Sequence, residues 1–138
     1  MSLKIGMLVD FMGGGDKTPE DEYQEIENLF KEILEETATF TRDIFPDKLS
    51  NDFVDIYVFD FGGLLPGYDS LIESHVSELI RQIEDHPNTL FVIWSNFTGE
   101  TFKGFLQKEA DEYFGEHHNV IISNGMTDEL EKRLKLMK

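Results

Sequence analysis

Short apolar runs alternate along the chain with longer segments of helical periodicity. Four of these runs are rich in Val, Ile, Leu and Phe and show little polar alternation, which is typical of strands buried on both faces. They predict strands at Lys4–Phe11, Phe53–Phe61, Leu90–Trp94 and Asn119–Ser123. A fifth strand at Thr37–Phe40 stays open, because the same residues are compatible with an extension of the preceding helix.

The first helical segment carries its own start signal. Thr18 and Asp21 have the spacing of a capping box, and Pro19 suits the first helical position. Apolar residues then recur at spacings of three and four, which puts them on one helix face. This face is predicted to be Tyr23, Ile26, Leu29, Phe30, Ile33 and Leu34, and the solvated face Glu20, Glu22, Glu25, Glu27, Glu32, Glu35 and Glu36.

Further helices are predicted after a second capping box at Ser70, over 102–113 and from Thr127 to Lys138. Strands that alternate with helices pair in parallel through right-handed crossovers. We therefore predict a single α/β domain over residues 1–138. Its architecture is expected to be a three-layer doubly wound parallel sheet of four or five strands with helices on both faces, of flavodoxin-like topology. Ligands of such sheets bind beyond the carboxyl ends of the strands, where the strand order reverses.

Polar residues follow every predicted strand at that edge. The stretch MLVDFMGGGD ends the first strand with Asp10 and runs through three glycines to Asp16, and the next strand ends with Asp60. Mg²⁺ prefers carboxylate oxygens and usually takes one or two of them plus substrate phosphates. Asp10 and Asp60 are therefore the predicted metal ligands, with Asp16 as a third. The residues predicted to bind a ligand are Gly13, Gly14, Gly15, Asp16, Gly62, Gly63, Ser95, Asn96, Thr98, Ser123 and Asn124.

The glycine run has two other interpretations. A metal-free phosphate cradle needs glycines that lead directly into a helix N-terminus. Here the helix is predicted to begin only at Thr18, and Asp10 and Asp16 flank the glycines and would repel a bare phosphate. In the structural interpretation, the aspartates cap turns and the glycines supply backbone conformations with φ > 0. The sequence leaves the metal site and the tight turn open as alternatives.

The charge balance constrains the partners. The chain has 28 acidic and 12 basic residues and a net charge of −16. This excess argues against a nucleic-acid backbone, which is bound through Lys and Arg, and against an anionic membrane. The simplest interpretation of the excess is solubility, and the functional interpretations are cation binding, a basic protein partner or mimicry of nucleic acid. The chain has no cysteine, which excludes disulfides and thiolate metal sites, and we expect a cytoplasmic location. No stretch approaches the roughly 20 apolar residues of a membrane span.

The sequence resembles two known families in part. It is similar to flavodoxins in size, acidity and topology, although MGGGD lacks the hydroxyls of their phosphate loop. It is similar to receiver domains at Asp10, Asp60 and Ser95, which match an acid after the first strand, the phosphorylated aspartate and a Ser/Thr position. Asp10 has no acidic neighbour, however, and Asn124 stands where receiver domains carry a lysine. The residues therefore assign the chain to neither family.

No complete catalytic set can be assembled from motifs, since GxGxxG, GxxxxGK[ST] and GxSxG are all absent. We therefore expect a non-catalytic ligand-binding or protein-interaction module. The alternative is a Mg²⁺-dependent enzyme that acts on a phosphate-bearing small molecule or nucleotide at the carboxyl edge of the sheet. A third hypothesis is a flat aromatic ligand such as a flavin, stacked on Tyr68, Trp94 and Phe97.

Overall fold

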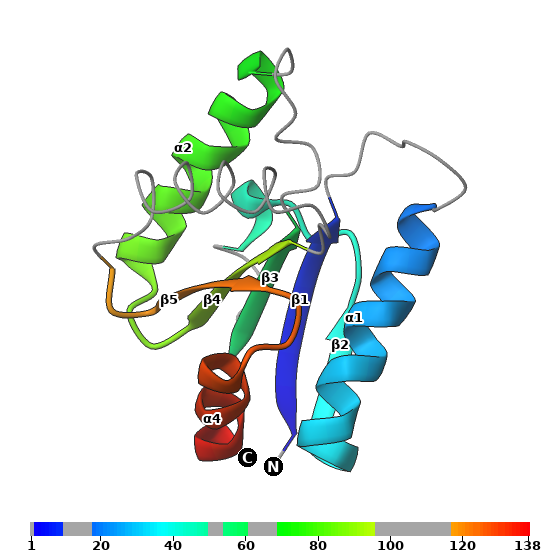
Figure 1. Ribbon diagram of the computed structural model, residues 1–138. Helices are drawn as coiled ribbons and strands as arrows, with labels where there is room; N and C mark the ends of the chain where they lie inside the picture. Colours follow the sequence, from blue (N-terminus) through cyan, green and yellow to red (C-terminus); the bar gives the residue numbers. More distant parts are fainter. Residues whose placement is uncertain (1, 10–17, 50–53, 61–68, 96–116) are drawn as a thin grey trace.

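The computed structural model describes residues 2–9, 18–49, 54–60, 69–95 and 117–138. Five parallel strands form one sheet in the order β2-β1-β3-β4-β5 (Figure 1). The strands are β1 (Leu3–Val9), β2 (Ala38–Thr41), β3 (Ile56–Asp60), β4 (Leu90–Ser95) and β5 (Val120–Asn124). The helices are α1 (Pro19–Leu34), α2 (Asp69–Asp85) and α4 (Asp128–Met137), with the short 3₁₀ helices η1 (Glu35–Thr37) and η2 (Pro46–Lys48).

The predicted parallel α/β sheet of flavodoxin-like topology is confirmed. All four strands expected from the apolar runs are present, and β2 raises the number to five. In β2, Ala38 and Phe40 pack against the core while Thr39 and Thr41 are exposed, so this strand alternates as an edge strand should. The helix predicted over 102–113 lies outside the described residues.

Helix α1 begins as the sequence predicts. The Thr18 Oγ1 atom accepts a hydrogen bond from the Asp21 backbone N–H at 3.2 Å, and Asp21 Oδ2 accepts from the Thr18 N–H at 3.1 Å. The predicted solvated face is wrong at two positions, because Glu22 and Glu27 are only 4% and 8% exposed. Glu27 can be buried because it forms an ion pair with Arg42, which follows β2 and is 15 residues away in the chain.

Two apolar cores lie on opposite faces of the sheet. Helices α1 and α4 cover one face, and α2 and η2 cover the other (Figure 1). Side chains of a strand point alternately to the two faces, so Ile56 and Val58 enter the α1/α4 core while Tyr57 and Phe59 enter the α2/η2 core. The sheet is therefore the middle of three layers, as predicted.

The described part of the crossover from β2 to β3 packs against the sheet. Its described part, residues 42–49 and 54–55, contains η2 but no α-helix. Ile44, Leu49 and Val54 fill the second core in place of a helix. A Cβ atom at Gly6 would lie 2.9 Å from Ile44 Cδ1, so a larger residue at this position in β1 would have to displace the end of the Ile44 side chain. None of the helices in the described part of the chain has both the length and the apolar character needed to cross a membrane.

Candidate functional site

Four neighbouring residues form a row at the carboxyl ends of the strands. Val9 of β1 is in register with Asp60 of β3, Asp60 with Trp94 of β4, and Trp94 with Ser123 of β5. Alternation along each strand puts the row on the sheet face that α1 and α4 cover, because Val9 and Trp94 belong to that core. The row therefore brings together two of the residues predicted from sequence, Asp60 and Ser123.

Asp60 is the acidic member of the row. It is the last residue of β3 and is 3% exposed. A buried carboxylate needs an ion, a proton or hydrogen-bond donors to offset its desolvation. Its hard oxygen atoms fit Mg²⁺, the metal expected from the sequence. No group of three or more His, Cys, Asp or Glu side chains that could hold a metal occurs within the described ranges, and Asp10 and Asp16 lie outside them.

Ser123 is also buried, at 1% exposure, but its described hydrogen bonds stay within the chain. Its hydroxyl donates to the Gly125 carbonyl oxygen at 2.6 Å and lies 3.1 Å from Thr127 Oγ1. Thr127 in turn caps α4 by accepting from the Leu130 N–H. Ser123 therefore fixes the turn between β5 and α4.

Trp94 lies between Asp60 and Ser123 and is completely buried. Its ring centroid is 5.9 Å from that of Phe30 in α1. The indole Nε1–H has no hydrogen-bond partner among the described residues. The hypothesis that Trp94 stacks on a flat ligand does not fit this position, because both faces of the ring are inside the core. Tyr68 and Phe97, the other two residues of that hypothesis, lie outside the described part of the chain.

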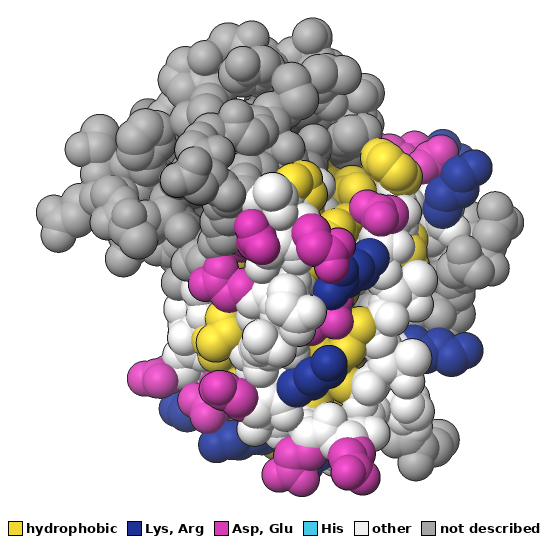
Figure 2. All heavy atoms as spheres, turned by 90° about the vertical axis from the view of Figure 1, so that its right-hand side faces the viewer, with side chains coloured by type: hydrophobic (Ala, Val, Ile, Leu, Met, Phe, Trp, Pro, Cys, Tyr) yellow, Lys and Arg dark blue, Asp and Glu magenta, His cyan; other side chains and the backbone are white. Residues whose placement is uncertain are grey.

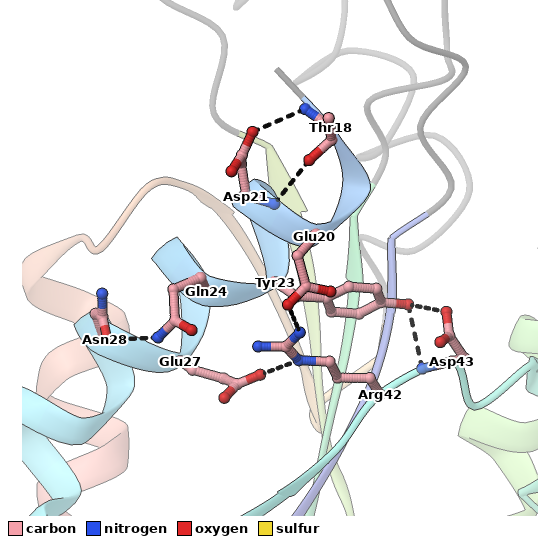
Figure 3. Close-up of polar contacts among 9 residues, drawn as sticks. All are labelled: Thr18, Glu20, Asp21, Tyr23, Gln24, Glu27, Asn28, Arg42 and Asp43. Carbon is pink, nitrogen blue, oxygen red and sulfur yellow. Dashed lines mark hydrogen bonds and ion pairs between the residues drawn. The ribbon is translucent and has the colours of Figure 1, made fainter. Parts of the chain in front are cut away.

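A network that the sequence did not reveal holds the end of β1. The Tyr23 hydroxyl of α1 accepts from the Val9 N–H at 3.0 Å. It also accepts from the Asp43 N–H at 3.1 Å (Figure 3). It donates to Asp43 Oδ1 at 2.8 Å. Burial, together with the Asp43 carboxylate, raises the pKa of Tyr23 to about 12. Three segments of the chain therefore meet at one neutral hydroxyl group.

Arg42 closes this network on the outer side (Figure 3). Its guanidinium group pairs with Glu27 and Glu20 of α1 and lies 5.4 Å from the centre of the Tyr23 ring. The hydrogen bonds that the guanidinium group donates to Glu27, which have the largest effect, and to Glu20 raise the pKa of Arg42. The cation over the ring adds attraction of its own. Arg42 therefore compensates the carboxylate that α1 buries beside Tyr23.

The side of the molecule with α1 and β2 does not present a single sign of charge. Figure 2 views it directly, and acidic and basic side chains are interspersed there with some exposed apolar surface. Arg42 pairs with Glu20, and Lys138 pairs with Glu35. The excess of acidic residues is therefore partly neutralised on this face.

Comparisons with known proteins place the fold. No family model matches the sequence, and no curated protein matches it. Among solved structures, the chain is similar to the BeF3-activated DrrB receiver domain over the whole length of both chains. The TM-score is 0.53 and the sequence identity is 18%.

The fold is flavodoxin-like. In a flavodoxin-like sheet, the strand order reverses between β1 and β3, and ligands bind beyond the carboxyl ends of these strands. Val9 and Asp60 are the register pair at that point. Ser95 and Asn124 form another register pair at the ends of β4 and β5. The remaining predicted site residues lie outside the described part of the chain: Asp10, Gly13, Gly14, Gly15, Asp16, Gly62, Gly63, Asn96 and Thr98.

Proposed function

We propose that the chain is a non-catalytic module of flavodoxin-like fold that binds a ligand at the carboxyl edge of its sheet and interacts with another protein. The observation that carries the proposal is the position of Asp60. Its carboxylate is 3% exposed and ends β3 beside the end of β1, at the reversal point of the strand order. Buried ionisable groups at such positions are typical of binding sites.

The ligand that fits best is Mg²⁺, alone or with a phosphate-bearing small molecule. Asp60 supplies one hard oxygen ligand, and Asp10, which follows Val9 directly in the sequence, supplies a second. Asp16 supplies a third metal ligand in this proposal. The phosphate is contacted by the glycines of the two glycine-containing stretches and by Ser95, Asn96, Thr98 and Asn124. The likeness to a receiver domain supports an interaction module, and the net charge of −16 favours a basic partner.

A Mg²⁺ titration followed by the fluorescence of Trp94, the only tryptophan, tests the ligand site. We expect a saturable change in the wild type that Asp60→Asn abolishes. The matched control is Asp55→Asn, because Asp55 directly precedes β3 and accepts a hydrogen bond from the Lys4 N–H at 2.8 Å, a bond that an asparagine oxygen can keep. Both variants remove one negative charge, Asp55→Asn directly before β3 and Asp60→Asn at its last residue.

The control distinguishes a specific site from diffuse attraction of cations to an acidic protein. An identical weak drift in the wild type and both variants would contradict the metal site. The similar receiver domain is described as BeF3-activated, so BeF3 added with Mg²⁺ is a suitable second probe. A BeF3 response that requires Asp60 would extend the likeness from the fold to the ligand.

The protein-interaction part of the proposal has its own experiment. The immobilised chain should retain a specific basic protein at low ionic strength and release it as salt rises, because screening weakens attraction between exposed charges. The Asp60→Asn variant tests whether the ligand site controls this contact. Retention of no specific protein at low salt would count against an interaction module.

The second candidate function is a Mg²⁺-dependent enzyme acting on a phosphate ester or nucleotide. The same buried carboxylate favours it, since a metal held by Asp60 would polarise a phosphate oxygen. In this case Asp16 acts as the base. A panel of phosphate esters and nucleotides with Mg²⁺ or Mn²⁺ should then give turnover that Asp60→Asn removes. No turnover across the panel would leave the non-catalytic module.

A further inference from the structure

We propose that Tyr23 is a positioning residue for the carboxyl-edge site, because its hydroxyl fixes the end of β1 beside Asp60. The inference rests on the proposed ligand site and adds a residue that the sequence analysis assigned only to the helix core. Tyr23 is 3% exposed and reaches from α1 to the backbone of Val9, the register partner of Asp60.

The end of β1 needs such a contact because its outer neighbour is short. Strand β2 pairs with β1 from Leu3 to Gly6 only, while β3 pairs with β1 as far as Val9. Buried backbone groups beyond Gly6 on the β2 side therefore need other partners. The Ile44 N–H donates to the Met7 carbonyl at 2.9 Å, and the Tyr23 hydroxyl accepts from the Val9 N–H. A helix side chain thus replaces the missing strand at the last described residue of β1.

The conformation of Asp43 makes this arrangement specific. Asp43 has φ of 61°, in the left-handed region that a non-glycine residue seldom adopts. This turn lets the Asp43 N–H and carboxylate both bond the Tyr23 hydroxyl while Ile44 reaches Met7. A hydroxyl group has one donor and two acceptor sites, so the described bonds use all of them. Strained backbone that the surroundings hold in place is often found at functional sites.

The consequence is a fixed spacing between the ends of β1 and β3. The Val9 peptide group is held on one side by β3 and on the other by Tyr23, and the Arg42 guanidinium group lies 5.4 Å from the centre of the Tyr23 ring. Groups behind metal ligands act in this way, and their loss typically weakens metal affinity about 10- to 100-fold. Loss of the Tyr23 hydroxyl should therefore change ligand binding at Asp60 without removing any ligand.

Tyr23→Phe tests the inference, and Tyr57→Phe is its matched control. Tyr57 also has a buried hydroxyl, which donates to the Ile44 carbonyl at 2.6 Å, but its side chain belongs to the core on the other face. Both variants lose a tyrosyl hydroxyl from the interior of the same protein. We expect Tyr23→Phe to raise the midpoint of the Mg²⁺ titration about tenfold or more, and Tyr57→Phe to change it by less than about twofold.

Amide hydrogen exchange gives a second readout that needs no metal. Exchange of the Val9 and Asp43 amides should become faster in Tyr23→Phe and stay as in the wild type in Tyr57→Phe. Asp43→Gly is a milder variant, since glycine keeps the left-handed backbone while the acceptor of the Tyr23 proton is lost. It should weaken Mg²⁺ binding in the same direction and by less.

The possible outcomes distinguish a failure of this inference from a failure of the proposed metal site. An Asp60-dependent Mg²⁺ response with the same midpoint in wild type and Tyr23→Phe would overturn the positioning role alone. Equal weakening in Tyr23→Phe and Tyr57→Phe would also overturn a role specific to Tyr23, because the Tyr57 hydroxyl bonds Ile44, the neighbour of Asp43, and would then be just as important. Absence of an Asp60-dependent response in the wild type would overturn the proposed metal site and the inference together.

Discussion

At the amino ends of the strands, the buried Asn119 side chain donates to the carbonyl oxygens of Ile83, His86 and Thr89, whereas at the carboxyl ends the buried Asp60 lies between Val9 and Trp94. The two ends of one sheet thus use buried polar groups for different purposes. Asn119 donates to carbonyl oxygens at the end of α2 and in the turn that follows. The last carbonyl groups of a helix have no partner within the helix and need one elsewhere.

At the amino ends of the strands, hydrogen bonds within the chain account for the polar groups described. Thr89 Oγ1 donates to the Val54 carbonyl at 2.8 Å, and Asp55 and Lys4 exchange backbone and side-chain hydrogen bonds. At the carboxyl end, the Nε1–H of Trp94, the neighbour of Asp60 in the row, is buried and has no partner among the described residues. Buried polar groups without hydrogen-bond partners break a general rule of protein structure, and such exceptions are expected at functional sites. The unpartnered indole N–H beside Asp60 therefore supports the proposal that the ligand site lies at the carboxyl end.

The largest effect should come from Asn119→Ala. The variant removes the donor of hydrogen bonds to three carbonyls at 3.0–3.3 Å and leaves them buried, so we expect a loss of about 3 kcal/mol in the free energy of unfolding. Urea denaturation measures this loss. The Mg²⁺ response of Trp94 should keep its midpoint, and a shifted midpoint would break the division between the two ends.

The Tyr23 network predicts a specific instability at alkaline pH. The pKa of Tyr23 is raised from 10.0 to about 12, so between these values the unfolded chain loses a proton that the folded protein keeps. The network's contribution is complete below pH 10 and falls as pH rises towards 12, by about 2 kcal/mol. Urea denaturation of wild type and Tyr23→Phe from pH 8 to 12 measures it as a shrinking difference between the two. A constant difference would mean that the hydroxyl is not held neutral.

A pair of hydroxyl deletions compares the two ends directly. Thr89→Val and Ser123→Ala each remove one hydroxyl that donates to a backbone carbonyl, at 2.8 Å and 2.6 Å. We expect each to lower the free energy of unfolding by about 1 kcal/mol. Because the Ser123 proton is directed to Gly125, both should leave the Mg²⁺ midpoint unchanged. A shift in Ser123→Ala alone would support the ligand-binding role that the sequence predicts for Ser123.

Local patterns predicted most of the fold. The capping box of Thr18 and Asp21 and the apolar spacing of α1 depend on neighbours within a few residues, and both are confirmed. The position of Asp60 at the carboxyl edge was also predictable, because the carboxyl ends of parallel strands lie at the same edge of a sheet.

The contacts around Tyr23 were beyond such reasoning. Tyr23 meets Val9 and Asp43 at separations of 14 and 20 residues, and the contact depends on the left-handed turn at Asp43. Glu27 was assigned to the solvated face for the same reason, since its burial depends on Arg42 beyond β2. A glutamate on a helix carries no local signal that tells a solvated carboxylate from one with a distant arginine partner.

The smallest predicted effect concerns the emission of Trp94, which reports on the carboxyl end from inside the core. Its side chain is 0% exposed and packs on Phe30. We expect emission at shorter wavelength than that of tryptophan in water and weak quenching by acrylamide. Because the ring does not contact solvent, Mg²⁺ binding at Asp60 should change the intensity of the emission with only a small change in its wavelength.

Phe30→Leu sharpens this expectation, because it removes the ring contact on the α1 side while keeping the site apolar. The emission wavelength should move slightly to the red, and the Mg²⁺ midpoint should stay within about twofold of the wild type, since Phe30 bonds nothing at the strand ends. Strong acrylamide quenching in the wild type would show that water reaches the indole. The carboxyl end would then be open to solvent at Trp94, and the row would not form a buried layer beneath the site.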